Sequence, residues 1–187
     1  ANLGLEGEVI VKASNKDVPG FTGYVFGNSD DFVNPVRQAL DATLVTDAEG
    51  KAAIPMTLPA IPKTDKPLEA EIFVKLREDG GRVIERKITL PVDLKSPRIG
   101  IKPGFERVVQ EDQEATFEIV AIDAANKAIA TDKLEWSLTR LDTNWQWYRR
   151  DGNWTYEAVT TKRKVGGGTL STAADAPAKL SQRLDWG

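Results

Sequence analysis

The chain has 187 residues, of which 41% are hydrophobic and 28% are charged, and its formal net charge is −3. These values are typical of a folded, soluble protein. They argue against a nucleic acid or an anionic membrane as partner, because both favour clusters of Lys and Arg. The chain contains no cysteine and no histidine, which excludes disulfides, thiolate metal sites, cysteine nucleophiles and a Ser-His-Asp triad. Without the commonest general base and metal ligand, we expect neither an enzyme nor a cofactor.

The beginning of the chain has neither a basic segment nor a following apolar segment, so we expect no signal peptide. No apolar run approaches the roughly 18 residues that a membrane-spanning helix needs. The chain also starts with Ala1 instead of Met. We therefore interpret it as a piece of a longer protein, and we expect no direct membrane contact from this piece.

Alternation of apolar and polar residues predicts strands in the first half of the chain. Residues 5–13 and 68–76 carry apolar side chains at nearly every second position, the pattern of a half-buried antiparallel strand. Two hairpins are predicted on this basis and from turn sequences: 68–76 with 84–92 around a turn at 78–81, and 42–46 with 51–58 around a turn at 47–50.

Residues 30–40 form the one segment where a helix is expected. Pro35 fits the first turn of a helix, and Val36 and Leu40 are four residues apart. We predict one or two turns of surface helix here, which would not change the all-β class.

A domain boundary is predicted near residues 90–97, where Pro91 and Pro97 disfavour a central strand and a helix. New alternating segments follow at 115–121 and 134–138, with a turn between them. Short strands separated by turns indicate a sandwich or barrel. We predict two tandem antiparallel β-sandwiches of the fibronectin or immunoglobulin kind, at 1–95 and 96–187, joined by a hinge at 93–97. We expect the second to be truncated at its C-terminal end, because its final edge strand is missing or only begun.

The most unusual segment contains four aromatic residues around an Asp-Gly hairpin turn at 151–152. Strand alternation places Trp145, Trp147, Trp154 and Tyr156 on one face of that hairpin. Three interpretations remain open. The four side chains fill a sandwich core, or they form a flat platform that stacks on sugars, or they dock another domain of the same polypeptide.

A glycine-rich segment follows within residues 159–179. It lacks the sequence of a phosphate-binding loop, and we expect a flexible loop between strands. A basic run precedes the glycines, so the loop is also a candidate site for cleavage by trypsin-like proteases. The residues concerned are Lys162, Arg163, Lys164, Gly166, Gly167 and Gly168.

Seven segments of the sequence carry a family resemblance: residues 19–27, 32–37, 47–52, 99–103, 134–138, 145–156 and 185–187. The most specific is the aromatic segment at 145–156, whereas the turn segment at 47–52 is weak alone. Together they resemble the macroglobulin-like domains of bacterial α2-macroglobulins.

The resemblance implies a large periplasmic protein, usually anchored to the inner membrane by a lipid, that serves bacterial defence by trapping proteases. In that family a protease cuts a bait region, and an internal thioester then captures it covalently. The thioester and the lipid anchor each need a cysteine, and this chain has none. The resemblance therefore implies a scaffold fragment, whose partners are neighbouring domains of the same polypeptide, target proteases of the full-length protein and a periplasmic penicillin-binding protein. The alternative is a module that binds carbohydrate or cell wall through the aromatic hairpin.

Overall fold

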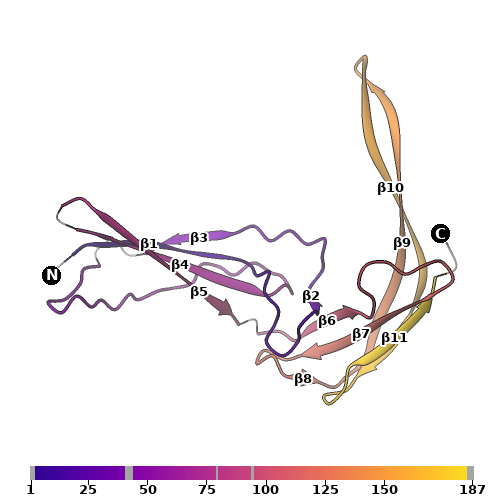
Figure 1. Cartoon of the computed structure of the whole chain (residues 1–187), viewed down its shortest axis with the longest axis horizontal. Coiled ribbons are helices and arrows are strands. Elements are labelled where there is room, and N and C mark those ends of the chain that lie inside the picture. The colour runs from indigo at the N-terminus through magenta and orange to yellow at the C-terminus, as the bar shows by residue number, and fades with distance from the viewer. Residues whose placement is uncertain (1–2, 41–43, 79, 94, 185–187) are drawn as a thin grey trace.

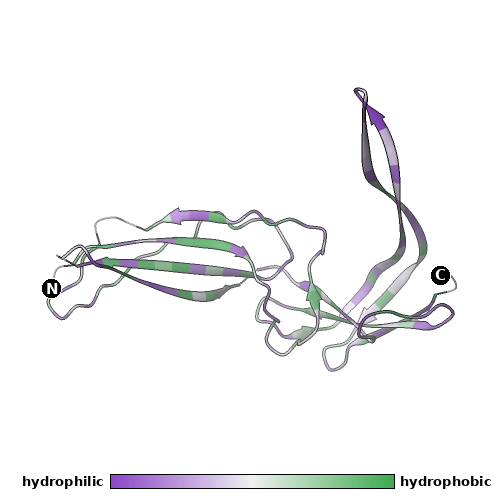
Figure 2. Ribbon diagram, turned by 45° about the horizontal axis from the view of Figure 1, so that its top comes forward, coloured by the Kyte–Doolittle hydropathy of each residue, from purple (hydrophilic) through white to green (hydrophobic). Residues whose placement is uncertain are grey.

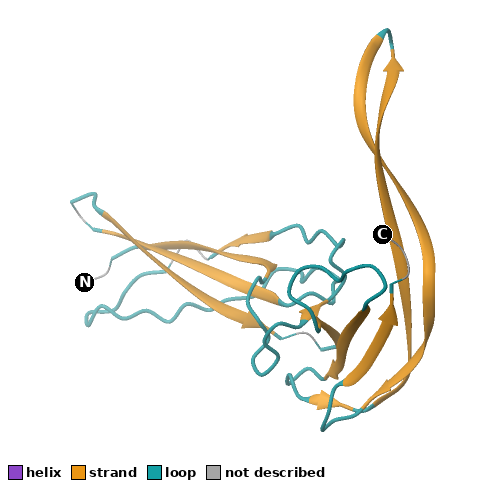
Figure 3. Ribbon diagram, turned by 45° about the vertical axis from the view of Figure 1, so that its right-hand side comes forward, coloured by secondary structure: helices purple, strands orange, loops and turns teal. Residues whose placement is uncertain are grey.

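Eleven strands form the regular structure of residues 3–40, 44–78, 80–93 and 95–184, which are the residues that the computed structural model describes. No helix occurs in these ranges, as Figure 3 shows. The strands are β1 (Leu5–Ala13), β2 (Val25–Phe26), β3 (Val36–Ala39), β4 (Leu68–Arg77), β5 (Val83–Val92), β6 (Arg98–Pro103), β7 (Glu114–Ile122), β8 (Ala128–Ile129), β9 (Thr131–Arg150), β10 (Asn153–Thr172) and β11 (Ala178–Arg183).

The strands are arranged as two lobes and one long ribbon (Figure 1). The first lobe contains a sheet of order β3-β1-β4-β5, and the second contains a sheet of order β11-β7-β6-β2 with β8 beside β7. The ribbon pairs β9 with β10 and projects away from the second lobe (Figure 1). All pairings are antiparallel, and the predicted all-β class is confirmed.

The core of the first lobe is built from the alternating positions that the sequence predicted. Val9 and Val11 of β1 and Leu68 of β4 are almost fully buried, and Ile54 and Val33 from irregular segments pack against them. Figure 2 shows the resulting hydrophobic bands on these strands. The buried cluster is Val9, Val11, Leu40, Leu68, Ala70, Ile72 and Val92.

Two predictions of local structure in this lobe are wrong. Residues 36–39 form strand β3 instead of a helix, because the exposed edge of β1 offers them backbone partners from Glu8 to Val11. Residues 51–58 have no regular structure. The turn at 47–50 is confirmed, since the backbone N–H of Asp47 donates to the carbonyl oxygen of Lys51 at 2.8 Å. Residues 42–43 of the predicted partner strand and Asp79 of the second predicted turn lie outside the described residues.

One segment of the first half joins the sheet of the second lobe. Strand β2 pairs with β6, so that Phe26 lies opposite Gly100. Phe26 and Val18 are buried with Val120 and Ile122 of β7. The chain therefore crosses between the lobes three times: near residue 18, between β2 and β3, and at the predicted hinge, of which Leu94 is outside the described residues. The predicted division at 95 and 96 stays a prediction about independent domains.

Candidate docking surface

The outer half of the ribbon presents an aromatic face to solvent. Strand pairing places Trp147 opposite Tyr156 and Trp154 opposite Arg149, so the four predicted aromatic side chains share one face, as expected. We call Trp145, Trp147, Trp154 and Tyr156 the aromatic face. Between 50% (Tyr156) and 65% (Trp154) of each of these residues is exposed. The interpretation of these residues as a sandwich core is therefore wrong for this chain.

A two-residue turn and a long uninterrupted pairing carry the aromatic face away from the lobe. Asp151 and Gly152 both have positive φ, 50° and 85°, as in the two-residue turns whose twist suits a hairpin. The strands then pair without interruption from the turn back to residue 164, where a bulge in β10 shifts the register.

The apolar side chains of β9 lie on opposite faces of the strand at the two ends of the ribbon. We call residues 134–138, beside the second lobe, the base, and residues 145–156, around the turn, the tip. Leu134, Trp136 and Leu138 are half-buried at the base, at even positions, and Trp136 and Leu138 line a cavity against the sheet of the second lobe. Trp145 and Trp147 occupy odd positions and therefore lie on the other face of the strand. The base packs on its own lobe, whereas the tip has no partner among the described residues.

The aromatic rings lie against one another instead of side by side. The ring centroid of Tyr156 is 5.2 Å from that of Trp145, with an interplanar angle of 25°, and 4.7 Å from that of Trp147, with an angle of 33°. Such offset stacking stabilises a ribbon that has no sheet behind it. It also brings three of the four rings into contact with one another, which reduces the ring area that a flat platform would offer to a sugar.

The predicted flexible loop is wrong for residues 159–172, which include the glycines and belong to β10, whereas residues 173–177 do connect β10 with β11. Lys162, Arg163 and Lys164 pair with Leu141, Arg140 and Thr139 of β9. The glycines make room for an indole: a Cβ at Gly168 would lie 3.1 Å from Nε1 of Trp136, and one at Gly166 would lie 3.4 Å from its Cζ3. Whether proteases cut here stays a prediction, but a paired strand must first open before a protease can bind it.

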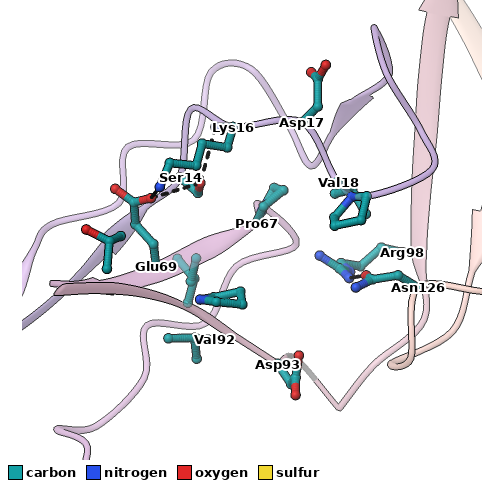
Figure 4. Close-up of a pocket in the computed structure, with 14 residues that line it drawn as sticks. Ser14, Lys16, Asp17, Val18, Pro67, Glu69, Val92, Asp93, Arg98 and Asn126 are labelled. Carbon is teal, nitrogen blue, oxygen red and sulfur yellow. Dashed lines mark hydrogen bonds and ion pairs between the residues drawn. The ribbon is translucent and has the colours of Figure 1, made fainter.

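A cleft of about 200 Å³ separates the two lobes. Figure 4 shows Arg98 and Asn126 on one side of it, and Ser14, Lys16 and Glu69 on the other. Lys16 pairs with Glu69 at 3.5 Å. The cleft thus contains charged side chains of both signs, which is typical of a contact between domains.

Arg98 is the buried cation of the lobe junction. Its guanidinium donates to Oδ1 of Asn126 and lies 5.8 Å from the centroid of the Phe26 ring, while its Nε has no hydrogen-bond partner. Burial lowers the pKa of Arg98, and Asp93 and Asp65 oppose that effect. Arg98 thus connects β6 with the segment that crosses from the first half of the chain.

Tyr24 provides a second contact of the crossing segment. Its hydroxyl donates to Oε2 of Glu118 on β7 at 2.9 Å. Burial, and then the hydrogen bond to the Glu118 carboxylate, raise the pKa of Tyr24 to about 12. The hydroxyl therefore stays neutral and keeps donating well into the alkaline range.

Neither a metal site nor a membrane helix is found in the part of the chain that the structure describes. No group of three or more acidic side chains there is arranged to hold a metal ion. No helix there is long and apolar enough to cross a membrane. Among the described residues, the aromatic face is the largest group of exposed aromatic side chains, and it is the candidate surface for binding a partner.

Two family descriptions match the chain one after the other. Residues 1–93 match the Bacterial Alpha-2-macroglobulin MG5 domain, and residues 100–187 match Bacterial macroglobulin domain 6. The chain belongs to the bacterial α2-macroglobulin family. The alpha-2-macroglobulin of Escherichia coli strain K12 is 25% identical over 200 aligned residues, which cover 98% of this chain and 12% of that protein.

Solved structures of bacterial α2-macroglobulins have the same fold. The native E. coli protein matches with a TM-score of 0.71 and 23% identity, over 100% of this chain and 12% of that one. A Salmonella α2-macroglobulin reacted with methylamine matches with a TM-score of 0.73 and 22% identity, over 100% of this chain and 13% of that one. The chain thus spans about an eighth of the length of these relatives.

Proposed function

We propose that this chain is a scaffold segment of a larger bacterial α2-macroglobulin, a broad-spectrum endopeptidase inhibitor that traps proteases after bait cleavage. The observation that carries the proposal is the order of the two matches, with an MG5 domain followed directly by domain 6. The chain has no cysteine, so the thioester chemistry that the resemblance implies belongs to another part of the longer protein.

The role of this segment in the proposal is mechanical and non-catalytic. The aromatic face docks a neighbouring domain of the same polypeptide, because exposed Trp and Tyr side chains are typical of the centres of protein interfaces. Target proteases meet the longer protein, which we place in the periplasm on a lipid anchor outside this chain. A periplasmic penicillin-binding protein stays a proposed partner on the family resemblance alone.

Docking is favoured over carbohydrate binding by the geometry of the rings. Both interpretations require exposed aromatic side chains, and the structure has them. Tyr156, however, stacks with Trp145 and Trp147, so these three rings do not form a flat row of open faces for sugars, and Trp154 lies outside the stack. Rings that stack on one another still bury large edges and outer faces when a protein surface covers them.

The proposal is tested with the longer polypeptide and with the 187-residue chain in parallel. Each is incubated with elastase or trypsin, and cleavage of a large protein substrate is compared with cleavage of a small chromogenic peptide. A trap protects the large substrate and spares the peptide, so we expect that result from the longer polypeptide and no effect from the chain alone. Failure of the longer polypeptide to protect the large substrate would contradict the inhibitor function. Covalent capture by the chain alone would contradict the scaffold role.

A further inference from the structure

The outer part of the ribbon is basic, whereas the rest of the chain is acidic. Residues 139–164 contain six of the 25 Lys and Arg residues and three of the 28 Asp and Glu residues, so their net charge is +3. The remaining residues contain 19 basic and 25 acidic side chains, a net charge of −6. The part of the ribbon that projects from the second lobe (Figure 1) therefore has the opposite charge to the remainder of the chain.

These basic residues include three that share a side of the ribbon with the aromatic face. Residues that alternate along a strand, or pair directly across it, lie on the same side. We therefore call the odd-numbered residues of 139–149 and the even-numbered residues of 154–164 the aromatic side. Its charged residues are Arg149, Lys162 and Lys164, and no Asp or Glu occurs at its positions. The aromatic side thus combines exposed rings with cations alone.

The acidic side chains of the two strands lie on the opposite side. Asp142 pairs in register with Thr161, and Glu157 with Gln146, all at positions that alternate with those of the aromatic side. Asp142 also forms an ion pair with Arg140 at 2.6 Å. The three cations of the aromatic side are exposed, and among the described residues none of them forms an ion pair. Their charge is therefore available to a partner.

The cations of the aromatic side are spread along the ribbon. Arg149 lies opposite Trp154 beside the turn, and Lys164 is ten residues farther along β10, which is about 30 Å at roughly 3.3 Å per residue. Between them lie the aromatic face and Leu141, which is 59% exposed. An apolar centre with charged groups around it is the usual anatomy of a protein interface. A partner that meets all of these groups needs a surface as long as a folded domain.

A lipid surface fits this arrangement less well than a protein surface. The end of the ribbon consists of Asp151, Gly152 and Asn153, so the residues that would enter a membrane first are polar and one of them is acidic. Segments that bind anionic membranes place apolar and basic residues at the contact. Lys162 and Lys164 are moreover distant from that end.

We propose that the surface that docks on the aromatic side is acidic, with Asp and Glu carboxylates facing Arg149, Lys162 and Lys164 around an apolar centre. Charge complementarity of this kind selects the partner and fixes its register. We commit to a domain of the same polypeptide outside residues 1–187, because the chain spans only 12% of its curated relative. The inference rests on the proposed function in one respect, that the aromatic face docks a neighbouring domain.

Zero-length cross-linking tests the chemistry of the partner. A carbodiimide joins a carboxylate to a lysine amine in contact with it as an amide, and mass spectrometry identifies both residues. In the longer polypeptide we expect Lys162 or Lys164 joined to an Asp or Glu outside residues 1–187. Lys87 and Glu71, 2.9 Å apart, are the internal standard and should be joined in every sample. The standard without a cross-link from either ribbon lysine would overturn the proposal, and a cross-link to a second copy of residues 1–187 would overturn our choice of partner.

Charge reversal gives an independent readout. Lys162→Glu in the longer polypeptide should raise acrylamide quenching of the tip tryptophans by about two-fold, because a like charge facing an acidic surface opposes docking. The matched control is Arg163→Glu, which makes the same change of charge at the next residue, on the opposite side of the ribbon, and should leave quenching unchanged. A protected tip that Lys162→Glu does not release would overturn the acidic partner and keep the docking. A tip that is unprotected in the parent would contradict the docking itself.

Salt and lipid complete the test. Raising the salt concentration from about 0.1 M to about 1 M shortens the Debye length from about 10 Å to about 3 Å, so quenching of the tip tryptophans in the longer polypeptide should increase. An apolar contact would not be weakened in this way, and unchanged or reduced quenching would overturn the proposal. The 187-residue chain should not sediment with vesicles of phosphatidylethanolamine and phosphatidylglycerol. Sedimentation that Lys162→Glu abolishes would identify a lipid surface as the partner and overturn the proposal.

Discussion

At the scale of single residues, the contact between the lobes depends on close approaches that only particular side chains allow. Phe26 lies against the backbone of Gly100, where a Cβ would come within 2.6 Å of the ring. Arg98 then lies beside the same ring. A glycine at position 100 is therefore required for the crossing segment to pack on β6.

Gly100→Ala should destabilise the protein by about 2 kcal/mol, because overpacking at a rigid contact with an aromatic ring outweighs the gain from a less flexible unfolded chain. Urea unfolding followed by circular dichroism measures the change. Gly4→Ala is the control, since a Cβ there meets no atom within 4 Å, and it should change stability by less than about 0.5 kcal/mol. Equal effects of the two substitutions would contradict the packing of Phe26 on Gly100.

Tyr24→Phe should lower stability by about 1 kcal/mol near neutral pH, because it removes the hydrogen bond to Glu118. The pKa of Tyr24 is raised to about 12, so the parent loses this contribution as the pH rises from about 10 through 12. The variant has no such loss, and the two stabilities should converge above pH 10. Urea midpoints at pH 8 and pH 11 measure the difference, and a constant difference would contradict the assignment.

At the scale of elements, the ribbon shows how one strand pair can serve two environments. Its base is apolar toward its own sheet, and its tip is apolar on the opposite face. An isolated two-stranded hairpin is only marginally stable in water, so the stacked rings contribute to holding the tip in place. A bulge in β10 lies between the base and the tip, as expected where the pairing register changes.

Acrylamide should quench most of the tryptophan fluorescence of the 187-residue chain, because Trp145, Trp147 and Trp154 are exposed and Trp136 is half-buried. In the longer polypeptide the quenching constant for these three residues should fall at least two-fold if the tip is docked. Single-tryptophan variants assign the signal, and a variant that keeps only Trp136 is the control. Unchanged quenching of the tip residues in the longer polypeptide would contradict docking.

At the scale of the whole molecule, the two lobes are joined by more than a hinge. The crossing segment contributes strand β2 and buried side chains to the second lobe, and charged residues of both lobes line the cleft between them. Because one core contains residues from both halves, the unfolding of one half should affect the other.

Residues 96–187 alone should be less stable than the same residues within the 187-residue chain, because the fragment lacks Val18, Phe26 and the pairing of β2 with β6. We expect a loss of at least about 3 kcal/mol, since the removal of a single large buried side chain costs about that much. Calorimetry of the fragment and of the whole chain measures it. The control fragment 18–187 retains the crossing segment and should keep most of the stability of the second lobe. Equal stability of both fragments would show that the lobes are independent.

The sequence alone determined the strands whose alternation is strict and the hairpin turn at 151–152, because these depend on local patterns. It also determined that the four aromatic residues share a face, since strand pairing around a two-residue turn leaves no other arrangement. Only the tertiary structure decided whether that face is buried, because burial depends on which sheet lies behind it. The tertiary structure also decided three other features: the pairing of residues 36–39 with β1, the pairing of β2 with β6, and the inclusion of the glycines in β10. Each depends on contacts between residues far apart in the chain.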